Sequence, residues 1–190
     1  MVEIQTPSKA EVDAYIKRWY ELENYVNQEN SLNKLFFDLL PENKLIEDIL
    51  IKASTLNDFY STNIFSIFPV AKHILELDID DRLNNGDLTL VEDIANVEEL
   101  GKRFYSFASK YCSHHKPNDF PIFDNYVSRV LMYFKKKDHF ANFKSDDLRD
   151  YIKFNEVLDE FAKFYGLEGY SRKELDMYLW QIGKKYFARF

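Results

Sequence analysis

The middle of the chain holds most of the side chains that could do chemistry. Cys112 has His115 three residues along, a spacing that lets a thiol nucleophile and its base meet on one helix. The competing interpretation is a small core residue, which is the more common role of a lone cysteine among aromatic neighbours. Both interpretations of Cys112 stay open at this point.

The histidines and glycines give no pattern of a cofactor site. His114 and His115 are adjacent, so they point to different faces of a helix and are not expected to share a metal ion. The chain has one cysteine, no His-Glu-x-x-His pair and no glycine-rich phosphate loop, which excludes the common zinc, iron–sulfur and nucleotide motifs. We therefore expect no metal and no cofactor.

A more informative pattern runs from residue 106 to residue 129. Ser106, Ala108 and Lys110 form a small-x-small-x-Lys segment, read as a turn before a helix, and a loop with two prolines then leads to Asp124 at the start of another helix. Taken alone, Asp124 is an ordinary N-cap worth about 1 kcal/mol, and Lys110 is an ordinary solvated lysine.

This segment resembles the helix-hairpin-helix DNA glycosylase superfamily, in its 8-oxoguanine-glycosylase-like branch. The resemblance aligns Ser106, Ala108 and Lys110 with the two glycines and the lysine of that family's hairpin. The loop and the helix after it correspond to Pro121, Asp124, Val127 and Arg129. The chain departs from the pattern because serine and alanine replace both glycines, and because Phe123 is an extra residue in the loop. Lys102, which follows Gly101, is a rival for the lysine position.

The resemblance implies an enzyme that removes a damaged or modified base from DNA, with 8-oxoguanine as the type case. Lys110 would be the nucleophile that attacks C1′ and forms a Schiff base, which adds strand cleavage to base release. Asp124 would stabilise the oxocarbenium character of the sugar in the transition state. The target base would be flipped out of the helix and held by aromatic side chains.

The remaining candidate residues follow from the same resemblance. The substrate contacts we expect are Phe123, Tyr126, His114, His115 and Trp180. The DNA contacts we expect are Ser106, Ala108, Arg129, Lys135 and Lys136. The run from Lys135 to Lys137 also has a purely structural explanation, because positive charge at the end of a helix complements its dipole.

Charge favours a competing class of protein. The formal net charge of the chain is −7, whereas affinity for phosphate backbones needs clustered lysine and arginine. The alternative is a helical interaction or nucleic-acid-binding module that has the same fold and no activity. DNA is the expected partner of the enzyme, no membrane partner is expected, and a monomer is favoured.

The elements that must position these residues are expected to be helices. The 190 residues include only five glycines and five prolines, and no convincing alternating strand occurs, so the fold class is all-α. We expect one domain over 1–190, or two small helical lobes, with the glycosylase-like motif over about 97–137. Expected helices include 12–26, 32–40, a stretch after Pro41, 97–111, 154–164 and one opened by Ser171. No segment reads as a signal peptide or a membrane span, so a cytoplasmic location is expected.

Overall fold

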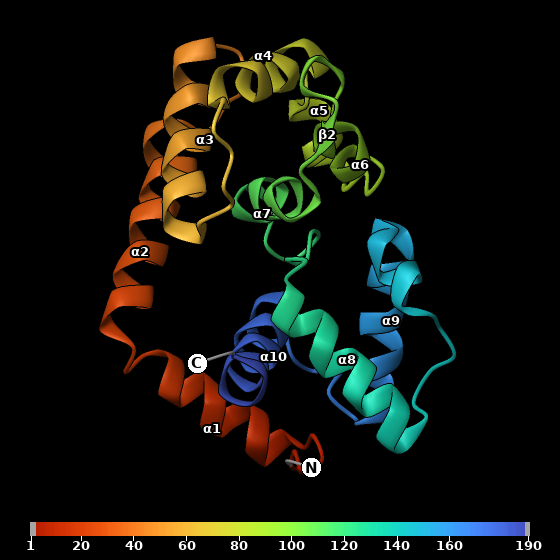
Figure 1. The fold of residues 1–190 in the computed structure, drawn as a ribbon. Helices are drawn as coiled ribbons and strands as arrows, with labels where there is room; N and C mark the ends of the chain where they lie inside the picture. The colour runs from red at the N-terminus through yellow and green to blue at the C-terminus, as the bar shows by residue number, and fades with distance from the viewer. Residues whose placement is uncertain (1–2, 189–190) are drawn as a thin grey trace. The chain divides into compact units, whose positions relative to one another are not determined.

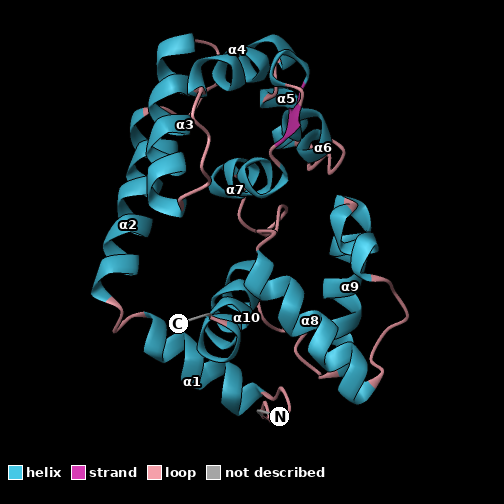
Figure 2. Cartoon of the chain, in the orientation of Figure 1, coloured by secondary structure: helices cyan, strands magenta, loops and turns pink. Residues whose placement is uncertain are grey.

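The computed structural model describes residues 3–188, and these residues form helices joined by loops, with one very short pair of strands (Figures 1 and 2). The mostly helical fold predicted from the sequence is therefore confirmed. The α-helices in chain order are α1 (Lys9–Trp19), α2 (Glu23–Asn33), α3 (Ile46–Tyr60), α4 (Ile67–Leu77), α5 (Asp80–Asn84), α6 (Leu90–Ala95), α7 (Tyr105–His115), α8 (Asn125–Asp138), α9 (Tyr151–Phe164) and α10 (Arg172–Phe187). A π-helix, η1 (Lys34–Leu39), and two 3₁₀-helices, η2 (Glu98–Leu100) and η3 (Ser145–Arg149), complete the helical elements.

The chain divides into two compact units. The terminal unit consists of Met1–Glu23 together with Phe123–Phe190, and the central unit consists of Asn24–Ile122. Lys110 and the hairpin-like segment of the sequence pattern belong to the central unit, whereas Asp124 belongs to the terminal unit.

Helix α10 organises the terminal unit, because α8 and α1 both pack against it. Gly183 makes the contact with α8 very close: a Cβ at this position would lie 2.5 Å from Tyr126 Cβ and 2.7 Å from Tyr126 O. Gln181 Nε2 donates to the Tyr15 carbonyl at 2.8 Å, which ties α10 to α1. A second part of the core is aromatic, with Phe134 and Phe161 packed at 5.9 Å between ring centroids.

The central unit is built around α7, which packs against α6 and α3. Between α6 and α7 the chain makes an antiparallel hairpin of β1 (Asn96–Val97) and β2 (Lys102–Arg103), coloured magenta in Figure 2. Gly101 closes this hairpin with φ +56, a backbone angle that glycine adopts without strain. The Phe104 amide then donates to the Ala95 carbonyl at 2.8 Å, so the end of α6 is joined to the start of α7.

Several helix ends agree with the sequence patterns. Ser8 caps α1 by accepting from the Glu11 amide, and Ser171 forms a full capping box with Glu174 at the start of α10. Gly166 follows α9 with φ +67. These ends were predictable because caps depend on local side-chain to backbone bonds.

Three helix predictions are wrong. The segment 12–26 is not one helix, because the chain turns between Trp19 and Glu23 and begins α2. Pro41 does not start a helix, since residues 40–45 are irregular and α3 begins at Ile46. The segment 97–111 is not helical throughout, because the β1–β2 hairpin and η2 occupy its first half.

The predicted turn at Ser106–Lys110 is also wrong. Both Ser106 and Ala108 lie inside α7, and Ala108 is fully buried. They therefore do not stand at the glycine positions of a hairpin. The hairpin of this region lies at 96–103 and contains Lys102, the rival lysine.

No helix between residues 3 and 188 is both long and apolar enough to cross a membrane.

Candidate functional site

Lys110 lies on α7 with only 3% of its surface exposed. Its Nζ donates to Ser106 Oγ at 2.5 Å and lies 5.2 Å from the centroid of the Tyr60 ring. Ser106 is one helical turn before Lys110, so α7 itself positions this pair. Lys102, in contrast, is exposed on β2.

His114 shares Tyr60 with Lys110. The Tyr60 hydroxyl and His114 Nε2 are joined by a hydrogen bond of 2.9 Å, and the His114 ring lies 5.5 Å from that of Phe36. We call Ser106, Lys110, Tyr60 and His114 the Lys110 cluster. A lysine amine can act as a nucleophile, and a tyrosine–histidine pair can move a proton. The cluster therefore holds groups suited to nucleophilic and acid–base steps.

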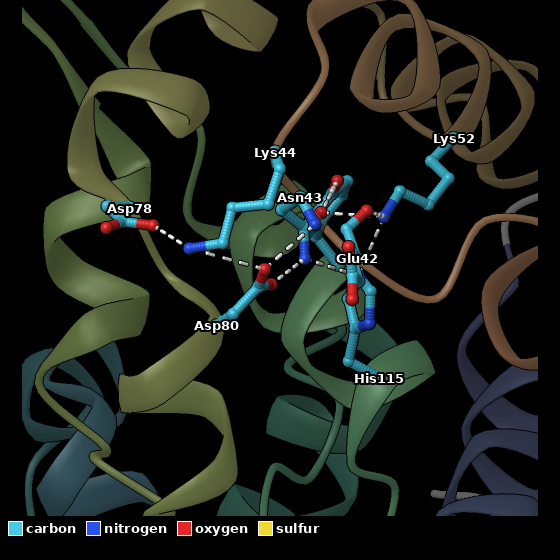
Figure 3. A network of polar contacts seen from close by, with 8 residues as sticks. Glu42, Asn43, Lys44, Lys52, Asp78, Asp80 and His115 are labelled. Carbon is cyan, nitrogen blue, oxygen red and sulfur yellow. Dashed lines mark hydrogen bonds and ion pairs between the residues drawn. The ribbon is translucent and has the colours of Figure 1, made fainter.

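A second polar cluster, which we call the Asn43 cluster, lies in the central unit around the irregular segment before α3 (Figure 3). Asn43 is 1% exposed, and its amide oxygen accepts from Lys52 Nζ at 2.7 Å and from the Tyr111 hydroxyl at 2.6 Å. Its Nδ2 donates to Asp80 Oδ1 at 2.7 Å, and its backbone amide donates to Asp80 Oδ2 at 3.1 Å. Asn43 thus connects α3, α5 and α7.

The geometry of the Asn43 cluster fixes the tautomer of His115. Asn43 Nδ2 lies 3.3 Å and Lys52 Nζ 3.4 Å from His115 Nε2. The Asn43 oxygen is already an acceptor for two other groups, so its amide nitrogen must be the group that faces the imidazole. Both neighbours bring N–H donors, so Nε2 is an acceptor and the imidazole is neutral.

Burial perturbs the titration of the groups in the Asn43 cluster. Burial is the largest cause that lowers the pKa of Lys52 to about 8, against smaller opposing effects of Asp80 and Asp48. Burial, with the Lys52 charge as the next cause, lowers the pKa of His115 well below its ordinary value. Burial also raises the pKa of Tyr111 well above its usual range, so this hydroxyl stays protonated and donates.

Of the residues in the Asn43 cluster, only His115 was predicted from the sequence as a candidate site residue. One signal was available, because Lys52 stands on the apolar stripe of α3 with Ile49, Ala53 and Leu56, all buried. A lysine at such a position must find polar partners. The partners come from residues 43 and 115, and no local pattern identifies them.

Asp124 is the N-cap of α8 in the terminal unit, and its Oδ1 accepts from the Tyr126 amide at 2.6 Å. The ordinary structural role that the sequence allowed is therefore present. A carboxylate has lone pairs for further acceptor contacts beyond this one.

Two of the three predicted basic DNA contacts of α8, Arg129 and Lys135, have structural partners. Arg129 Nη1 donates to the Phe187 carbonyl at 3.0 Å. Lys135 donates to the Phe143 carbonyl and lies over the Phe143 ring. Lys136 is exposed, and Lys137 donates to the Ile4 carbonyl at 2.8 Å. Lys135 and Lys137 thus hold loops of the terminal unit to the end of α8.

The predicted aromatic contacts are all in the terminal unit. Phe123 packs edge-on against Phe154 at 5.4 Å between centroids. Tyr126 presents its backbone and Cβ to Gly183. Trp180 lies edge-on to Trp19 at 5.7 Å.

Cys112 is fully buried in the central unit, and burial raises the pKa of its thiol far above the ordinary value. The thiol therefore stays protonated, which is the form that a small core residue needs and not the form of a nucleophile.

A surface pocket of the central unit, about 410 Å³ in volume, lies between α4 and the hairpin region. Four of its ten lining residues are acidic, namely Glu76, Asp93, Glu98 and Glu99. His73 Nε2 donates to the Asp93 carbonyl at 2.7 Å. Within residues 3–188, no group of three or more histidine, cysteine or acidic side chains has the arrangement of a metal site.

Comparison with other proteins shows to which family the chain belongs. Residues 11–119 match the HI_0787_N family, described as an N-terminal domain. The chain belongs to this family. The matched residues include the Lys110 cluster and the Asn43 cluster and end before Asp124.

The family match is accompanied by a close relative. The chain is 50% identical over 153 residues to a protein of Haemophilus influenzae described as uncharacterized, and the alignment covers 79% of this chain and 73% of that protein. No solved structure matches the chain.

Proposed function

We propose that the protein is a DNA glycosylase-like enzyme that removes a damaged or modified base from DNA. The observation that carries the proposal is the Lys110 cluster: a lysine 3% exposed, hydrogen bonded to Ser106 Oγ and facing Tyr60. A lysine amine in its neutral form can attack a sugar carbon. The resemblance stated above assigns the same lysine to that step.

The connection between α6 and α7 supports the proposal. Helix, β-hairpin and helix follow one another over residues 90–115, and the hairpin carries Gly101 and Lys102. Backbone amides at such a turn suit a phosphate. In this arrangement Lys102 contacts the DNA backbone, and Lys110 is the nucleophile.

The chemistry assigned to Lys110 is a displacement at C1′. Its amine forms a bond to C1′ while the bond between C1′ and the base nitrogen breaks, and the base leaves with the electron pair and gains a proton. The deoxyribose ring then opens to a Schiff base on the lysine. The resemblance assigns to Asp124 the stabilisation of the positive charge that develops on the sugar.

Borohydride trapping tests this proposal. Duplexes containing 8-oxoguanine, uracil or an abasic site are incubated with the protein and borohydride, which reduces a Schiff base to a stable amine. We expect a covalent adduct that Lys110→Gln loses and Lys116→Gln, a control just beyond α7, retains. The abasic duplex tests the nucleophile independently of which base is recognised.

Asp124 needs a variant that separates chemistry from helix capping. Asparagine caps a helix as well as aspartate does, so Asp124→Asn removes the charge and keeps the bond to the Tyr126 amide. We expect slower base release at unchanged stability. Asp124→Ala loses about 1 kcal/mol of stability in addition.

The alternative function is a nucleic-acid-binding or interaction module without catalysis. The observation in its favour is that Ser106 and Ala108 lie inside α7 and not in a hairpin. An adduct lost only in Lys102→Gln would move the nucleophile to the hairpin. No adduct and no base release on any of the duplexes would refute the enzyme and favour the module.

A further inference from the structure

The two tryptophans of the chain lie together on the terminal unit. Trp19 ends α1 and Trp180 is in the middle of α10, and their rings meet edge-on with centroids 5.7 Å apart. Each indole is partly exposed. Tyr20, which follows Trp19 in the chain, is 66% exposed.

Lysines accompany both indoles. Lys173 Nζ lies 5.9 Å from the centroid of the Trp19 ring, and Lys184 Nζ lies 4.8 Å from that of Trp180. These are cation–π distances, and both ammonium groups come from α10. We call Trp19, Trp180, Lys173 and Lys184 the tryptophan surface.

The acidity of the chain does not extend to the terminal unit. The central unit, residues 24–122, has 9 lysines and arginines against 16 acidic residues, which gives −7. The terminal unit has 16 of each, which gives zero. The whole net charge of −7 therefore belongs to the central unit, and the charge objection to a polyanionic ligand does not apply to the tryptophan surface.

Two acidic side chains of these helices form hydrogen bonds with groups outside the tryptophan surface. Glu174 accepts from the Ser171 amide and hydroxyl in the capping box, and Asp13 accepts from the Tyr170 hydroxyl at 2.7 Å. Meanwhile the last turn of α1 carries Lys17 and Arg18. These cationic groups lie on the same helices as the indoles, together with the acidic Asp176 one helical turn before Trp180.

We propose that the tryptophan surface binds single-stranded polynucleotide. Bases stack on Trp19 and Trp180, and Lys173 and Lys184 move from the ring faces to neighbouring phosphates. Partly exposed aromatic rings interleaved with lysines are what single-strand recognition requires, because every base has a face that stacks. This binding needs no catalytic step and so goes beyond the glycosylase-like function proposed above.

Intrinsic fluorescence tests the proposal directly, because the chain has only two tryptophans and both lie in this surface. The probe is a short oligothymidylate, with an oligouridylate arm to compare DNA with RNA. We expect quenching on titration, and about 5- to 100-fold weaker binding for Trp180→Leu or Trp19→Leu, with the remaining indole as the reporter. A duplex of the same length should bind more weakly, because its bases are already stacked on one another.

Lysine variants cover the case in which a tryptophan variant does not fold. Lys184→Gln should weaken binding and reduce the salt slope by about 0.7, while Lys163→Gln, an exposed lysine on α9, should bind like the wild type. Absence of quenching at low salt, equal affinity for duplex, or equal effects of Lys184→Gln and Lys163→Gln would each overturn the proposal. Lys110→Gln should keep this binding, so a failure of the glycosylase-like function is distinguishable from a failure of this one.

Discussion

Lys52 allows a quantitative test of the electrostatics of the central unit. Its amine is fully buried and donates to the Glu42 carbonyl at 2.8 Å and to Asn43 Oδ1 at 2.7 Å. Neither acceptor carries a charge, so burial lowers the pKa of Lys52 from 10.5 to about 8. We predict that this group makes the free energy of unfolding rise with pH on the alkaline side.

The sign follows from proton binding. Between pH 8 and 10.5 the unfolded chain keeps the Lys52 proton, while the folded protein releases it. The unfolded state therefore binds more protons in this range, and stability rises with pH. The difference between the Lys52 pKa in the unfolded and in the folded state corresponds to about 3 kcal/mol in the free energy of unfolding. Screening by solvent reduces this contribution to about 2 kcal/mol.

The perturbation is Lys52→Met, which keeps an unbranched side chain, one atom shorter than that of lysine, and removes the titrating group. Urea unfolding followed by circular dichroism, at several values between pH 7 and 10.5, gives the stability difference between wild type and variant. Relative to Lys52→Met, the wild type should gain about 2 kcal/mol over this range. Lys34→Met, at an exposed lysine of η1, serves as the control and should show a nearly constant difference.

A constant difference for Lys52→Met would refute the reasoning. It would mean that Lys52 holds its proton in the folded protein as firmly as in the unfolded chain. A difference that falls with pH would show that nearby carboxylates such as Asp80 outweigh burial.

Two further predictions concern the acid range and the packing of α10. Burial and the Lys52 charge lower the pKa of His115 well below 6.5, so the unfolded chain binds more protons below that pH and stability should fall on acidification. A His115→Gln variant should lose that part of the acid dependence in the same urea assay. An unchanged acid profile would show that His115 is protonated in the folded protein as readily as in the unfolded chain. Gly183→Ala places a Cβ 2.5 Å from Tyr126 Cβ, so the melting temperature should drop by an amount equivalent to about 1 to 3 kcal/mol. The matched control is Gly169→Ala, where a Cβ meets nothing within 4 Å. Equal melting temperatures for the two variants would contradict the close contact.

The sequence by itself determined the helical fold and many helix ends. Asp124 and Ser171 were predicted to open helices, and each does so with its own side chain accepting from a backbone amide. These predictions succeed because a cap is made within three or four residues.

Tertiary structure decided where the chain departs from helix. The hairpin at 96–103 lies in a segment whose apolar spacing predicted a helix, but Gly101 in the left-handed region and the bond from Phe104 to Ala95 redirect the chain. Pairing between strands of two residues leaves no periodic pattern to detect.

Tertiary structure also decided the surroundings of the polar residues. Lys110 could be read from sequence as a candidate nucleophile, but its burial beside Tyr60, 50 residues away, could not. Lys52 looked like one more lysine in a helix, and only folding brings Asn43 and His115 to it. Burying a charged or polar group is tolerated only where distant segments supply its hydrogen bonds, and the identity of those segments is a property of the packed fold and not of local sequence.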